Sequence, residues 1–167
     1  QYIGVKRCKK CHLQQWQTWE QTKMASAFEL LKPGARAEVK ANRKLEPQKD
    51  YTTDAKCLRC HTNGFGHLGG YPDPAVGDSR AAQANAGIGC ESCHGPADAH
   101  VQDWEKSKPK LPTSRADCTR CHARIVSRPD WYPQIDPKEH NPDSKCIDCH
   151  EIHPAALDDA KAREGTP

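Results

Sequence analysis

Ten cysteines fall into five Cys-x-x-Cys pairs, and a histidine directly follows each pair. Two thiols at this spacing can form thioethers to the two vinyl groups at one edge of a porphyrin, and the adjacent imidazole then reaches the iron as its proximal ligand. The pattern predicts five covalently attached haem c groups. In chain order the motifs are Cys8, Cys11 and His12; Cys57, Cys60 and His61; Cys90, Cys93 and His94; Cys118, Cys121 and His122; and Cys146, Cys149 and His150.

Two other uses of paired cysteines explain the pattern less well. Zinc sites can be built from two Cys-x-x-Cys pairs, but zinc gives no reason for a histidine after every pair. A disulfide within each pair would be a redox-labile loop suited to thioredoxin-like chemistry, which needs a βαβ context that the sequence lacks. We therefore favour haem over zinc and over disulfides.

The composition fits a fold that is built around cofactors. Only 35% of the 167 residues are hydrophobic, two are Phe, and the mean hydropathy is −0.93. An ordinary apolar core of the usual size is difficult to form from so few apolar side chains. We expect one pentahaem cytochrome c domain over residues 1–167, mostly α with extensive loops and little or no β, whose core is formed by stacked haems.

The remaining histidines and the single methionine are candidates for the opposite, distal face of each iron. They are His67, His100, His140, His153 and Met24. A surface or hydrogen-bonding role stays open for each histidine, and simple helix packing stays open for Met24. Methionine ligation would raise the potential of its haem above that of bis-histidine neighbours.

Spacing excludes several pairings within one motif. Met24 would lie ~18 Å along a helix from His12, so it cannot bind the same iron. His153 follows His150 too closely to pass around the porphyrin edge. His67 and His100 each follow a proximal histidine by six residues, at most ~20 Å of extended chain, so we expect both to serve neighbouring haems.

Periodicity and punctuation predict short helices joined by loops. The predicted helices are His12 to Leu31, Ala35 to Leu45, Ala97 to Lys106 and Ala155 to Arg163, and the predicted loops are Thr62 to Gly89, Lys108 to Pro112 and Pro129 to Pro142. No alternating run of β-branched residues predicts a strand.

Charge and targeting signals bear on location and partners. The formal charge of +3 becomes about −2 once ten propionates and five ferric centres are included, and the basic residues are scattered, so we expect no nucleic-acid partner.

No run approaches the ~18 apolar residues of a membrane span. The chain starts at Gln1 without a Met, a basic segment or an apolar run, so we expect that a secretion signal has been removed and that the protein is periplasmic or extracellular.

Three runs resemble the OmcE-type extracellular filament cytochromes and, more distantly, the tetrahaem cytochromes that accept electrons from hydroxylamine oxidoreductase. They are Trp16 to Pro33, Lys49 to Tyr71 and Gly87 to Pro96. The resemblance covers roughly residues 5 to 122, which hold four motifs, and leaves 123–167 as a fifth-haem extension. It implies alternating parallel and perpendicular haem pairs and mostly bis-histidine ligation. In the filament branch it also implies a homopolymer with a haem ligand shared between subunits.

The resemblance also implies two ligand pairs. Met24 stands where the relatives carry a distal histidine for the third haem, which suggests His94 with Met24, and the histidine after the third motif suggests His12 with His100. We expect an electron carrier that meets redox partner proteins or an extracellular acceptor. The alternative is a reductase or oxidase of a small nitrogen or sulfur species at one haem with an open coordination position.

Overall fold

The computed structural model describes residues 1–76, 79–112, 114–123, 135–136 and 138–153. Within these ranges the chain forms short helices and loops and no named strand, with isolated bridges at Thr62–Ala86 and Ala123–Ile135. The helices are α1 (Val5–Cys8), α2 (Leu13–Glu20), the 3₁₀ helix η1 (Ala27–Leu31), α3 (Ala37–Asn42), α4 (Ala55–His61), α5 (Ser79–Ala84), α6 (Cys90–His94), α7 (Asp98–Gln102), α8 (Arg115–His122) and the 3₁₀ helix η2 (Cys146–Asp148). The expected fold class, mostly helix and loop, is confirmed.

The single long helix expected from His12 to Leu31 is wrong. Helix α2 ends at Glu20, and the chain passes through turns before η1 begins at Ala27. The turns release backbone carbonyls that a continuous helix would occupy: Met24 O accepts from Ile88 N at 3.1 Å, and Ala27 O contacts the ring of His61. Contacts with the second motif and with the residue two positions before the third thus replace the helical hydrogen bonds.

Other expected elements are shorter than predicted. The expected helices over 35–45 and 97–106 shrink to α3 and α7, and the expected loop over 62–89 contains the short helix α5. Proline and glycine marked the segments correctly, but the ends of short helices depend on tertiary contacts. The expected final helix, Ala155 to Arg163, and much of the expected loop from Pro129 to Pro142 lie outside the described residues.

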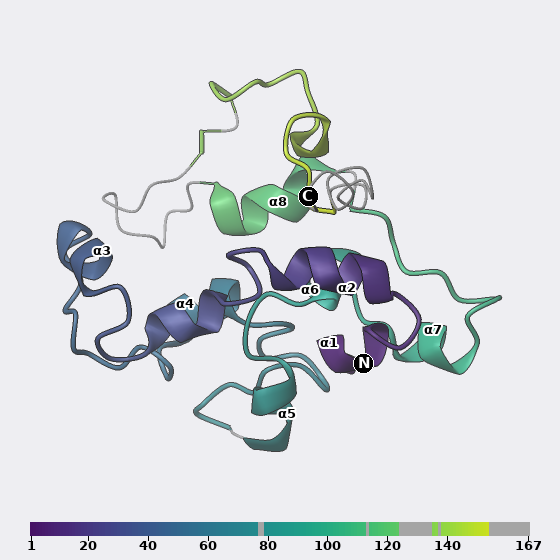
Figure 1. Ribbon diagram of the computed structural model, residues 1–167, viewed down its shortest axis with the longest axis horizontal. Coiled ribbons are helices and arrows are strands. Elements are labelled where there is room, and N and C mark those ends of the chain that lie inside the picture. The colour runs from purple at the N-terminus through teal and green to yellow at the C-terminus, as the bar shows by residue number, and fades with distance from the viewer. Residues whose placement is uncertain (77–78, 113, 124–134, 137, 154–167) are drawn as a thin grey trace, which may run out of the picture.

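Segments that are distant in sequence lie side by side in Figure 1, where α1 and α2, in purple, lie beside the teal α6. Helix α1 packs against α6, and η1 packs against α4. These contacts bring the first attachment motif to the third, and the residues after α2 to the second. The yellow-green segment that carries the fifth motif lies near α8 (Figure 1).

The apolar core is small and lies in one place. Its buried cluster consists of Leu31, Tyr51, Leu58 and Tyr71 beside α4. Large apolar side chains elsewhere are exposed, among them Trp104 at 64% and Leu111 at 76%. Such a core agrees with the expectation that side chains alone do not fill the interior. Among the described residues, no helix is both long and apolar enough to cross a bilayer.

Candidate haem-binding sites

Each attachment motif forms one helical turn, or part of one. The amide of His12 donates to Cys8 O at 2.9 Å, and that of His150 donates to Cys146 O at 2.9 Å, while the second, third and fourth motifs lie on α4, α6 and α8. Residues three and four apart share one face of a helix. The turn therefore places both cysteines and the histidine of a motif on the same side, as attachment to one porphyrin requires.

Three pairs of histidine rings share one separation. The ring centres lie 6.2 Å apart in His12 and His100, 6.4 Å in His94 and His153, and 6.2 Å in His140 and His150. The two planes of each pair are inclined by 28°, 20° and 31°, respectively. Each pair joins one expected proximal histidine to one expected distal candidate.

The shared separation fits a metal ion between the two rings. Two metal–imidazole bonds of about 2 Å, made from opposite sides of one ion, place the ring centres roughly 6 Å apart. Nearly parallel rings packed face to face with nothing between them would have their planes about 3.5–4 Å apart. Since a haem iron takes four nitrogens from the porphyrin and leaves two axial positions, the residues present fit haem c.

Hydrogen bonds leave the far nitrogen of several rings available to a metal. The Nδ1 atoms of His61, His94 and His100 lie 2.6, 3.0 and 2.7 Å from the carbonyl oxygens of Ala27, Lys110 and Ser107. A carbonyl oxygen can only accept, so Nδ1 carries the proton and donates. The lone pair is then on Nε2, the tautomer required of a histidine that binds metal through Nε2.

The attachment cysteines of different motifs meet in two places. The Cys8 and Cys90 thiols are hydrogen-bonded to each other, which lowers the pKa of Cys8 and raises that of Cys90. Burial, followed by the charge and hydrogen bond of Cys146, raises the pKa of Cys118 to about 11. The first motif therefore adjoins the third, and the fourth adjoins the fifth.

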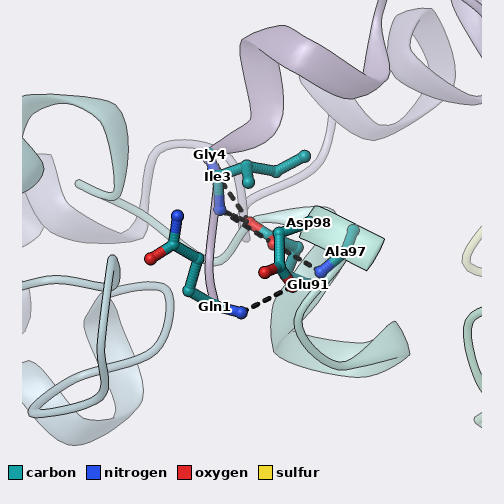
Figure 2. Close-up of polar contacts among 6 residues, drawn as sticks. All are labelled: Gln1, Ile3, Gly4, Glu91, Ala97 and Asp98. Atoms are coloured by element: carbon teal, nitrogen blue, oxygen red, sulfur yellow. Dashed lines mark hydrogen bonds and ion pairs between the residues drawn. The ribbon is translucent and has the colours of Figure 1, made fainter. Parts of the chain in front are cut away.

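A buried carboxylate that the sequence did not predict, Glu91 of the third motif, binds the chain just before the first motif and just after the second. Glu91, 1% exposed, lies between the cysteines of the third motif. It accepts from the amides of Ile3, Gly4 and Ala97 at 2.9–3.1 Å, as Figure 2 shows, and from Asn63 Nδ2 at 3.1 Å. An acidic residue inside an attachment motif was the available signal, but its donors come from three separate segments.

Figure 2 also shows a second contact beside Glu91. The amino group of Gln1 lies 2.5 Å from Asp98 Oδ1, and this ion pair lowers the pKa of Asp98. Asp98 is the first residue of α7, the helix that carries His100. The segment before α1 is thus held against the third motif and against α7, which carries His100, the residue whose ring faces His12.

The other expected site residues are placed as follows. His67 is exposed, and its ring lies 5.9 Å from that of Tyr2. Met24 is half-buried, with its carbonyl bound to the amides of Ala27 and Ile88. The carbonyl of His122, at the end of α8, accepts from Ile135 N at 2.8 Å. The structure brings His153, not the Met24 suggested by resemblance, opposite His94.

Comparison with known proteins identifies the family of this chain. The family described as cytochrome c554 and c-prime matches residues 7–95 and 97–151. Cytochrome c-554 of Nitrosomonas europaea is 38% identical over 168 residues, which cover 82% of this chain and 68% of that protein. The solved structure of the reduced state of cytochrome c554 from N. europaea superposes with a TM-score of 0.61 at 33% identity and covers 82% of this chain and 74% of the other. The chain therefore belongs to the cytochrome c554 and c-prime family.

Proposed function

We propose that this protein transfers electrons through five covalently bound haem c groups. The observation that carries the proposal is the repeated separation of 6.2–6.4 Å in three histidine pairs, each containing a proximal histidine of an attachment motif. When bound, haem c supplies an iron that accepts and releases one electron at a time. An iron held by both histidines of a pair would have no position left for a substrate, which favours electron transfer.

The arrangement of the motifs supports passage of electrons between sites. The cysteine contacts place the first motif beside the third and the fourth beside the fifth, so neighbours in space are not always neighbours in sequence. The third and fourth motifs also lie close together: burial raises the pKa of both Cys93 and Cys118, the charge of Arg120 in the fourth motif acts on Cys93, and Cys93 in turn raises the pKa of Cys118. Four of the five proposed sites therefore form one connected group.

The proposed setting is outside the cytoplasm, in the periplasm or at the cell surface, with redox proteins as partners. The support is the c-type attachment pattern and the resemblance to exported cytochromes. With haem bound, the net charge of about −2 is too small to favour a strongly charged polymer as the partner. We propose no catalytic residues.

Electron paramagnetic resonance of the oxidised protein, combined with a redox titration, tests the proposal. Reversible reduction of all haems and low-spin signals from the irons of the three histidine pairs would support it. A dominant high-spin signal that shifts with nitrite, nitric oxide or hydroxylamine would favour the reductase instead. Failure to undergo reversible reduction would contradict electron transfer.

A filament is a second proposal, and the loop that carries His67 supports it. His67 is exposed, and Leu68 beside it is 79% exposed, so the loop presents a metal-binding side chain and an apolar one together. Such a residue could complete the coordination of a haem in a second copy of this chain. Negative-stain imaging would show filaments of the native protein that are lost in His67→Ala and kept in Lys138→Ala. Small discrete particles of the native protein would contradict polymerisation.

A further inference from the structure

The segment after the fifth motif reaches back to the third motif. The rings of His94 and His153 are 6.4 Å apart and inclined by 20°, the most nearly parallel of the three histidine pairs. His94 ends α6, whereas His153 follows the fifth motif. A side chain outside all five motifs thus occupies the position opposite the third proximal histidine.

Both rings have a hydrogen-bond partner at Nδ1, which leaves Nε2 available to a metal. His94 Nδ1 donates to Lys110 O at 3.0 Å. His153 Nδ1 lies 3.5 Å from Thr18 Oγ1, a hydroxyl that already donates its own proton to Gln15 O. Thr18 can therefore only accept from His153, which puts the proton on Nδ1 and leaves Nε2 free.

The backbone before His153 is anchored to the fourth motif. Arg115, the first residue of α8, donates to the carbonyl oxygens of His140, Asn141 and Ser144 at 3.1, 2.7 and 2.6 Å. The thiols of Cys118 and Cys146 are also in contact. Only two residues separate His150, whose ring faces His140, from His153.

We propose that His153 is the sixth ligand of the third haem, so that the fifth-haem segment completes the coordination of the third iron. This inference rests on the proposed haem binding at Cys90, Cys93 and His94. Assembly of the fifth site then decides whether the third iron is closed or open to small molecules. Met24, which the resemblance suggested for this position, is half-buried, and its carbonyl accepts from Ile88 N.

Electron paramagnetic resonance of the haem-loaded variants tests the assignment. His153→Ala should convert one haem per chain from low spin to high spin, and added imidazole should restore the low-spin signal. Met24→Leu should leave the spin-state count unchanged. A spectrum of His153→Ala with the wild-type spin-state count, or a new high-spin haem in Met24→Leu, would overturn the inference.

A second variant distinguishes loss of a ligand from misfolding of His153→Ala. His153→Met should keep the third haem low-spin while raising the reduction potential of one haem, because a thioether ligand favours the ferrous state. An unchanged set of potentials would count against ligation. Peptide mass spectrometry of the wild type shows whether haem is attached to Cys90 and Cys93. If it is attached but the variants have no effect, the His153 ligand is refuted and the proposed function stands.

Discussion

The ring of His94 lies 6.4 Å from the ring of His153, although one residue belongs to the third attachment motif and the other follows the fifth. The same separation recurs in His12 with His100 and in His140 with His150. Two of these pairs, His12 with His100 and His94 with His153, join segments that are distant in sequence, as an apolar core does in most domains. Each haem then contributes to the fold as well as to the chemistry.

Replacing Arg115 should loosen the fifth segment. Arg115→Ala removes three hydrogen bonds to backbone carbonyls, which we expect to cost about 1–2 kcal/mol of unfolding free energy and to raise the high-spin fraction of the third haem. Arg115→Lys should restore little, because one ammonium cannot reach three carbonyls as a guanidinium does. Thermal unfolding and electron paramagnetic resonance measure both effects.

The matched control is Lys138→Ala, which removes an exposed cation from the same segment. It should leave both readouts at the wild-type values. Equal effects of Arg115→Ala and Lys138→Ala would mean that general surface charge, and not the three hydrogen bonds, holds the segment.

Removing the Glu91 carboxylate should be among the most destabilising single changes. Glu91→Ala leaves the buried amides of Gly4 and Ala97 and the half-buried amide of Ile3 without their acceptor, at a cost of about 3–5 kcal/mol. Glu91→Gln retains the shape but has one acceptor oxygen, so it should lose less. Unfolding followed by circular dichroism measures the difference, and Glu105→Ala at an exposed position is the control. A loss in Glu91→Ala no larger than in Glu105→Ala would show that the buried network contributes little.

Substitution of two glycines in the loop that carries His67 distinguishes the cost of backbone strain from the cost of a steric clash. Gly69 has φ +76°, and an added Cβ would lie 2.2 Å from Tyr2 O; Gly66 has φ +73° and open space around it. Gly66→Ala should cost about 1–2 kcal/mol from the left-handed backbone alone. Gly69→Ala should cost roughly 1–3 kcal/mol more, since Tyr2 must move. Equal melting temperatures for the two variants would refute the close approach of Tyr2 to the loop.

The contact between Lys110 and Asp117 should make stability depend on acid pH. The Lys110 ammonium, by hydrogen bonding, lowers the pKa of Asp117 below its ordinary value. A carboxyl with a lowered folded-state pKa contributes stability that is fully present above pH ~4 and is lost as the pH falls through the folded pKa. Asp117→Asn should therefore be less stable than wild type at pH 7, and the difference should shrink below pH ~4. Unfolding measured at several pH values checks this, and a difference that does not change with pH would contradict it.

The sequence predicts the attachment chemistry of this protein better than its geometry. Cysteine spacing predicts one proximal histidine for each motif, because attachment depends on a local turn. A single helix was expected over the residues that form α2 and η1. It is interrupted where Met24 O accepts from Ile88 N, just before the third motif, and Ala27 O contacts the ring of His61 in the second.

Long-range relationships were the hardest to predict. Resemblance suggested that His12 and His100 would meet, and their rings do, but it also suggested Met24 for His94, where the structure places His153. The motif cysteines gave no sign that Glu91 would bind three separate segments. Such contacts depend on the path of the whole chain, which no local pattern encodes.

Intact-protein mass spectrometry of the mature, haem-loaded protein tests the central claim most directly. The account predicts one dominant species whose mass exceeds that of the polypeptide by five covalently bound haems, and conversion of His150 and its motif cysteines to alanine should lower the count to four. A wild-type protein that carries four haems or fewer after complete maturation, with free thiols at any of the five motifs, would contradict it.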